Sequence, residues 1–178
     1  MFEAGIVIIY MTDKVNQSPG VDTPSQDFGD HWDSILTDIE TTATRYDNDG
    51  WKSLALHPGH ITPLAGKPDN LWGFDVLLPD DEFATLENTI ADVTITDYEL
   101  FSTEASGGVF LMSVMRAESE TVAIIFPLYY RLGDDSISAL KTHTAKTGSV
   151  RTYLRRLEND RRIEFQYDKP GLFFPSQL

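Results

Sequence analysis

The chain has 178 residues, a length typical of one folded domain. Its lack of cysteine excludes disulfide bonds and cysteine-ligated zinc or iron–sulfur sites. Its 28 acidic and 14 basic residues give a net charge of −14, which argues against binding to nucleic acid or to an anionic membrane, because both depend on Lys and Arg.

The N-terminal residues 1–26 are expected to form a disordered or extended lead-in, and a single domain is placed at residues 27–178. Residues 1–11 form an apolar run that is too short to span a bilayer and lacks the basic start and cleavage site of a signal peptide. This run fits either an edge strand or a gene-model extension ahead of a start at Met11, and we prefer the second. The protein is therefore expected to be soluble and cytoplasmic.

The first half of the domain alternates helices with strands. The spacing of apolar side chains predicts helices at residues 30–49 and 80–91 and strands at residues 51–57, 71–78 and 93–103. Asp30 and Asp80 are the expected caps of the two helices, and acids in the first turn of the second helix suit the positive end of its dipole. Residues 59–70 are interrupted by proline and glycine and are predicted to form a loop. A change of parity in the third strand predicts a bulge near residue 96.

The second half is dominated by two apolar runs, at residues 109–115 and 122–130, which are joined by a short polar linker. They predict adjacent antiparallel strands that are covered on both faces, because the runs hardly alternate. A weaker helix is predicted at residues 134–146. It precedes a predicted hairpin of residues 149–158 and 161–167, although the first segment also fits a helix. The order of elements indicates an α+β domain with a mostly antiparallel sheet of about five to seven strands and two or three helices packed on it.

Two histidines, His57 and His60, flank a Pro-Gly turn at the end of a predicted strand. With His31 or Asp75 completing the set, they could hold zinc or iron. The turn gives the pair no fixed helical geometry, so solvent-facing imidazoles are the favoured interpretation. A small metal-dependent enzyme or metal-binding protein that uses His31, His57 and His60 is the alternative function.

A basic segment at residues 141–169 contrasts with the rest of the chain. It holds 8 basic and 4 acidic residues, whereas residues 1–140 carry a net charge of −18. Arginine binds carboxylate and phosphate groups in bidentate fashion. The candidate ligand-binding residues are Arg151, Arg155, Arg156, Arg162, His143 and Tyr153. The favoured interpretation is that these side chains neutralise the acidic body from within, and the alternatives are a self-association surface and a site for a small anion.

The acidic excess is rich in Asp and poor in Lys, with 18 Asp, 10 Glu and 6 Lys, which we interpret as adaptation to molar salt. At about 1 M salt the Debye length is only ~3 Å, so repulsion between like charges largely vanishes. An ordinary acidic protein is the alternative. The run at residues 50–59 and the ending at residues 165–174 resemble an uncharacterised family of small acidic proteins from halophilic archaea, over about residues 27–174. That resemblance implies a haloarchaeal cytoplasm and no particular chemistry.

These observations favour a non-enzymatic binding or interaction domain of a halophile cytoplasm. The segment at residues 141–169 is the expected contact surface for a protein or an anion. We expect a homo-oligomer or a protein partner, and no cofactor.

Overall fold

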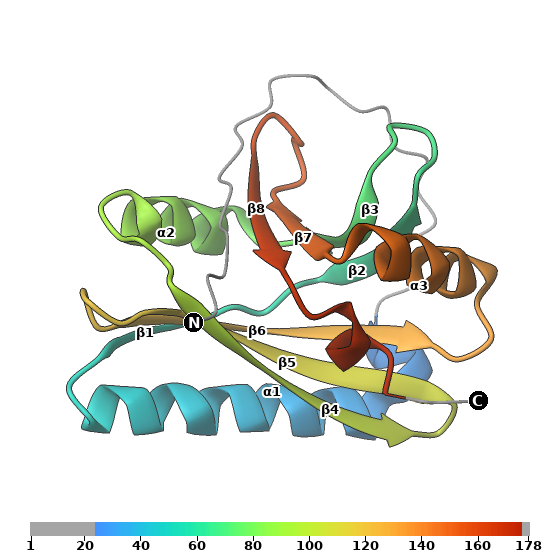
Figure 1. Cartoon of the computed structure of the whole chain (residues 1–178). Helices are drawn as coiled ribbons and strands as arrows, with labels where there is room; N and C mark the ends of the chain where they lie inside the picture. Colours follow the sequence, from blue (N-terminus) through green and yellow to red (C-terminus); the bar gives the residue numbers. More distant parts are fainter. Residues whose placement is uncertain (1–23, 176–178) are drawn as a thin grey trace.

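Within residues 24–175, which the computed structural model describes, eight strands and three α-helices build the fold (Figure 1). The predicted α+β class is confirmed. The helices are α1 (Pro24–Asn48), α2 (Asp80–Ile90) and α3 (Asp135–Thr147), and a short 3₁₀ helix, η1, spans Pro170–Phe173. The strands are β1 (Lys52–Ala55), β2 (His60–Ala65), β3 (Trp72–Leu77), β4 (Asp97–Ala105), β5 (Gly108–Ala117), β6 (Val122–Arg131), β7 (Val150–Arg155) and β8 (Arg162–Tyr167).

The strands divide between two four-stranded sheets. The first sheet has the order β1-β6-β5-β4, and the second has the order β2-β3-β7-β8. Both sheets are mixed, since β1 runs parallel to β6 and β3 runs parallel to β7, while the other neighbours are antiparallel. The two apolar runs of the sequence are the adjacent antiparallel strands β5 and β6, as predicted.

Strands β5 and β6 of the first sheet are buried on both faces, which explains why they read as nearly continuous apolar runs. On one face, Ile39 of α1 packs in a cluster with Val114 and Ile125. On the other face, the first sheet meets the apolar side of the second sheet, where the rings of Phe126 and Phe165 stack with centroids 6.0 Å apart. Figure 1 shows the resulting order of layers, with α1 below the first sheet and the second sheet above it, flanked by α2 and α3.

The main departure from the sequence prediction is β2, which occupies half of the predicted loop at residues 59–70. Pro63 lies within this strand, and proline cannot donate a hydrogen bond to a strand ladder. β2 lies at the edge of the second sheet and pairs with β3 on one side. One side of its backbone therefore needs no ladder partner, and the edge position tolerates proline.

Several predicted element ends are also wrong. α1 begins six residues before the expected cap, Asp30, and no side chain caps α2, so Asp80 is not a cap. β4 pairs with β5 without interruption, and the parity change near residue 96 marks the start of the strand instead of a bulge. The ambiguous segment at residues 149–158 forms the strand β7.

The predictions for the N-terminal lead-in at residues 1–26 lie outside the described residues, apart from residues 24–26, which belong to α1. No helix of the described part of the chain is long and apolar enough to cross a bilayer.

Candidate functional site

The second sheet has one apolar and one polar face, because side chains alternate along its strands. Phe74 and Val76 of β3 and Leu154 of β7 pack in the core. Between them, Asp75 and Tyr153 take the opposite face, where the strand register places them side by side. We call this opposite face the polar face, and the members that matter below are Asp75, Arg151, Tyr153, Arg155, Arg162 and Glu164.

Asp75 and Arg155 form a buried ion pair at the middle of the polar face. Each residue is 5% exposed. The Arg155 Nε donates to Asp75 Oδ1 at 2.8 Å, and its Nη2 donates to Asp75 Oδ2 at 2.9 Å. This bidentate geometry satisfies both carboxylate oxygens and ties β3 to β7.

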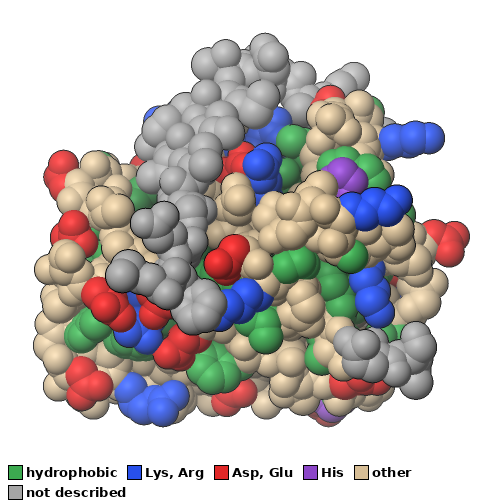
Figure 2. All heavy atoms as spheres, in the orientation of Figure 1, with side chains coloured by type: hydrophobic (Ala, Val, Ile, Leu, Met, Phe, Trp, Pro, Cys, Tyr) green, Lys and Arg blue, Asp and Glu red, His purple; other side chains and the backbone are tan. Residues whose placement is uncertain are grey.

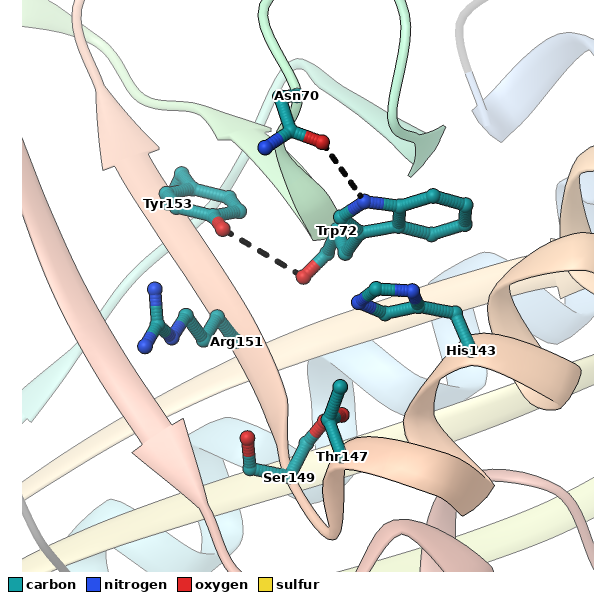
Figure 3. Close-up of a pocket in the computed structure, with 7 residues that line it drawn as sticks. All are labelled: Asn70, Trp72, His143, Thr147, Ser149, Arg151 and Tyr153. Atoms are coloured by element: carbon teal, nitrogen blue, oxygen red, sulfur yellow. Dashed lines mark hydrogen bonds between the residues drawn. The ribbon is translucent and has the colours of Figure 1, made fainter.

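A pocket of about 240 Å³ opens where one end of the polar face meets α3 (Figure 3). Its lining residues are Asn70, Trp72, His143, Thr147, Ser149, Arg151 and Tyr153. Three of the residues predicted from the sequence, Arg151, His143 and Tyr153, thus share one pocket. Figure 3 shows His143 reaching in from α3 beneath the Trp72 ring, with Arg151 and Tyr153 on β7 opposite.

One wall of the pocket is held rigidly by Trp72. The indole stacks on the His143 imidazole with centroids 3.8 Å apart and planes inclined by 6°. Gly66 backs the indole, since a Cβ added there would lie 2.6 Å from Trp72 Cζ2, and Gly66 also has a φ of +88°. The indole Nε1 donates to Asn70 Oδ1 at 3.3 Å, and the Tyr153 hydroxyl donates to the Trp72 carbonyl at 3.4 Å. The wall is therefore preformed before any ligand arrives.

Arg151 borders both the pocket and a buried carboxyl group. Its Nε lies 3.1 Å from Glu164 Oε1, and its side chain is 43% exposed whereas that of Glu164 is 6% exposed. The angle of this contact is too poor for a hydrogen bond, so Glu164 Oε1 is buried without a hydrogen-bond donor in the described structure. Burial raises the pKa of the Glu164 carboxyl, and the charges of Arg151 and Arg162 oppose that rise.

Arg155, Arg156 and Arg161 of residues 141–169 contact acids of the same chain. Arg156 donates to Asp160 at 2.8 Å, and Arg161 donates to Glu87 of α2 at 2.9 Å. Arg155 is held by Asp75 as described. Over the coloured atoms of Figure 2, Lys and Arg side chains lie scattered among acidic and uncharged ones and form no continuous patch. These contacts are of the kind expected if the segment neutralises acids of the same molecule, which is the interpretation favoured from the sequence.

The three candidate metal-binding histidines have different partners and do not meet at one site. His57 is bracketed by two carboxylates, with its Nδ1 2.7 Å from Glu82 Oε1 and its Nε2 2.6 Å from Glu40 Oε1. Burial lowers the pKa of His57, but the hydrogen bonds to Glu82 and Glu40 outweigh burial and raise it above its usual value. The His57 ring therefore joins α1 to α2, and the two carboxylates favour its protonated form.

His31 bonds instead to Ser106 Oγ at 3.0 Å. It lies nine residues before Glu40 on α1, a separation of about 14 Å along a helix axis. His60 lies on β2, in register with Leu77. Among the described residues, no group of three or more His, Asp or Glu side chains is placed to hold a metal ion.

Sequence reasoning missed four of the pocket residues, Asn70, Trp72, Thr147 and Ser149. Trp72 falls within the strand predicted at residues 71–78, and the structure shows its side chain half-buried and facing the pocket. Gly66, six residues earlier, has a left-handed backbone that lets it approach the Trp72 ring closely. In the sequence, a single glycine does not indicate which aromatic ring it will contact.

Comparison with known proteins places the chain in a family without assigning it an activity. A family model matches residues 20–175, and the chain belongs to DUF7529, a family of unknown function. No curated protein and no solved structure matches the chain. The predicted resemblance to an uncharacterised family is confirmed to this extent, while the haloarchaeal source stays a prediction.

Proposed function

We propose that this member of DUF7529 is a non-enzymatic binding domain of a halophile cytoplasm, which holds a small acidic metabolite in the pocket between α3 and β7. The observation that carries the proposal is the convergence of Arg151, His143 and Tyr153 on one pocket with a preformed wall. A preformed site loses less entropy on binding than a flexible one. The volume of about 240 Å³ suits a ligand of metabolite size.

The chemistry of the lining supports an acidic ligand. None of the seven lining residues is acidic, while Arg151 brings a permanent positive charge and Asn70, Thr147 and Ser149 bring hydrogen-bonding groups. The Nε of Arg151 faces Glu164, and its side chain also interacts with the Tyr153 side chain. At 43% exposure, the Arg151 side chain is still open to a ligand. Its guanidinium fork matches carboxylate and phosphate oxygens.

We favour binding over catalysis because no hydroxyl group of the pocket is hydrogen-bonded to a base in the described structure. A hydroxyl nucleophile needs a base within hydrogen-bond reach. In the described structure, His143 stacks on Trp72 and makes no hydrogen bond to Thr147 or Ser149. The metal-dependent alternative gains no support from His31, His57 and His60. His31 bonds to Ser106, His57 bonds to Glu40 and Glu82, and His60 pairs with Leu77 in the β2–β3 ladder, so the three rings do not converge.

The test is a thermal-shift and calorimetric screen in about 2 M KCl with acetate, benzoate and inorganic phosphate as probes. A ligand at 100 times its Kd adds about 2.7 kcal/mol, which raises the Tm by ~5–10 °C for a chain of this size. Arg151→Gln should weaken the best probe by about 10-fold to 150-fold, the value of a charge-assisted hydrogen bond.

Arg161→Gln is the matched control, because Arg161 belongs to the same hairpin but pairs with Glu87 of α2. It should leave the response unchanged. A flat screen, or equal binding by the Arg151→Gln variant, would contradict the proposal and favour a protein partner.

A further inference from the structure

Strand β4 forms an open edge of the first sheet, since β5 is its one strand neighbour in the described structure (Figure 1). Residues 101–104 of this strand are exposed, and Phe101 at their start is 50% exposed. The unpaired backbone groups of an exposed strand edge are a template for pairing with another strand. β4 therefore offers backbone hydrogen bonds to a partner strand.

The other three sheet edges carry features that oppose pairing, and β4 lacks them. β1 has four residues, β2 contains Pro63, and β8 turns the charged Arg162 and Glu164 inward. Short strands, proline and inward-pointing charges all hinder edge-to-edge pairing between molecules. β4 has nine residues with neither proline nor lysine, so its edge is unprotected, as expected of a strand that meets a partner.

The backbone groups available on this edge belong to the even-numbered residues of β4. Ala105 lies beside the two-residue turn into β5 and pairs with that strand. Alternate residues of an antiparallel strand point their N–H and C=O groups to the same side, so the odd-numbered residues bond to β5. The Tyr98 N–H accordingly donates to the Asp97 side chain at 2.8 Å instead of to β5. Leu100 and Ser102 follow at the same two-residue spacing and face outward.

We infer that β4 pairs antiparallel with β4 of a second copy of this chain, which joins the two first sheets into one continuous sheet. Two-fold pairing centred on Phe101 gives each of the nine residues a partner, because Phe101 is the middle residue of the strand. In this register the outward-facing Leu100 and Ser102 of the two copies exchange backbone hydrogen bonds. Phe101 lies opposite Phe101 of the second copy, with the two Cβ atoms about 4.5–5.5 Å apart.

The charges of β4 are compatible with this register. Its acids are residues 97, 99 and 104, and they face residues 105, 103 and 98 of the second copy, which are uncharged. Like charges in opposite positions would destabilise the pair. Asp97 and Glu99 also lie 3.7 and 2.8 Å from Nη1 of Arg116, so a cation of the same chain offsets them.

A groove beside Phe101 continues this surface on the side of the sheet that α1 covers. It measures about 380 Å³, and its aromatic lining residues are Tyr46, Trp51 and Phe101. Opposite residues of paired strands lie on the same face of a sheet, so Phe101 of the second copy lies beside this groove and covers part of the exposed ring. This contact surface goes beyond the proposed ligand pocket between α3 and β7, and it differs from the segment at residues 141–169 that the sequence favoured.

The test is the mass of the full chain, measured by light scattering over a range of concentrations in about 2 M KCl, which screens the repulsion between two chains of charge −14. The mass should rise from 20.0 kDa towards twice that value with concentration, because two paired strands make a small and reversible interface. Phe101→Lys should weaken the dimer at least about 30-fold, as the loss of a central interface residue does. Ser102→Pro removes an outward N–H and should also weaken the dimer, while the monomer stays folded because that N–H does not bond to β5.

Leu157→Lys is the matched control, because Leu157 is 76% exposed but lies outside β4, and it should leave the dimer unchanged. Hydrogen exchange at the Leu100 and Ser102 amides reports on the edge itself and should slow as the dimer forms. A mass of 20.0 kDa at every concentration would overturn the inference. If the two amides of such a monomer are protected, another segment of the same chain covers the edge. A dimer that survives both β4 substitutions, or that Leu157→Lys weakens equally, would use a different surface and would also contradict it.

Discussion

The first and second sheets differ in what their outer faces carry. In the first sheet, β5 and β6 are apolar on both sides, since α1 covers one face and the second sheet covers the other, while the end of β4 is exposed. The second sheet shares that core with one face, but its other face carries Asp75, Arg155, Arg162 and Glu164, each nearly buried. One sheet therefore provides a conventional core, while the other holds charged groups at positions where apolar residues would be more stable.

This difference has a consequence for stability. Buried ion pairs contribute little net stability compared with apolar residues of similar volume. The pocket that we propose as a ligand site lies at one end of this polar face, and proteins commonly give up stability at functional sites. Substitutions on the two sheets test this distinction.

The largest effect is expected from breaking the ion pair on the polar face. Asp75→Asn leaves the Arg155 guanidinium buried beside a neutral amide, and it should lower the free energy of unfolding by about 3–5 kcal/mol. The double substitution Asp75→Leu/Arg155→Met removes both charges and should recover most of the loss. Urea unfolding in about 2 M KCl measures both variants.

The core of the first sheet should lose a similar free energy of unfolding under the same measurement, but from a different physical cause. Phe126→Ala, at a residue with 0% exposure, should cost about 3–5 kcal/mol through lost burial and the cavity left behind.

The ion-pair prediction has a clear contradicting outcome. If the double variant Asp75→Leu/Arg155→Met is no more stable than Asp75→Asn, the charges of the polar face are needed for folding, and the contrast between the two sheets fails.

A smaller effect is expected at the pocket wall. Gly66→Ala places a methyl group 2.6 Å from the Trp72 ring at a φ of +88°, and it should cost about 2 kcal/mol and change the tryptophan fluorescence. Gly50→Ala is a matched control, because its φ is +87° but nothing lies within 4 Å of the added carbon.

The control should cost only the backbone strain, about 1 kcal/mol. Equal losses in the two variants, with unchanged fluorescence, would mean that Gly66 does not hold Trp72 in place.

The smallest effect concerns the pH dependence of the His57 contact between α1 and α2. Its pKa is raised in the folded state, so the folded protein binds this proton more tightly than the unfolded chain does. The stabilisation is therefore complete below the unfolded pKa of about 6.5 and is lost as the pH rises through the folded pKa. His57 is 40% exposed, which limits the effect to about 1 kcal/mol or less.

Unfolding free energies between pH 5.5 and 8.5 measure this dependence, and NMR titration of the His57 ring gives its pKa. His57→Gln should flatten the profile in that range. A His57 pKa at or below 6.5 would contradict the role assigned to Glu40 and Glu82.

Only part of the candidate site could be predicted from the sequence. Arg151, His143 and Tyr153 were identified because a basic segment is visible in the sequence, and the structure places them in one pocket. Arg156, chosen by the same reasoning, pairs with Asp160 four residues away. The local charge pattern indicates where arginines gather, but it does not distinguish an arginine facing a pocket from one already paired.

Hydrophobic periodicity in the sequence determined most of the elements, among them β5, β6, α2 and α3, because each depends on the spacing of its own side chains. Only the tertiary structure decided that there are two sheets and that the strand β2 forms at an edge that tolerates Pro63. It also decided that Asp75 meets Arg155 and that Trp72 meets His143. These contacts join residues about 70 to 80 positions apart, and such pairings arise from strand register and packing, which leave no periodic signal in the chain.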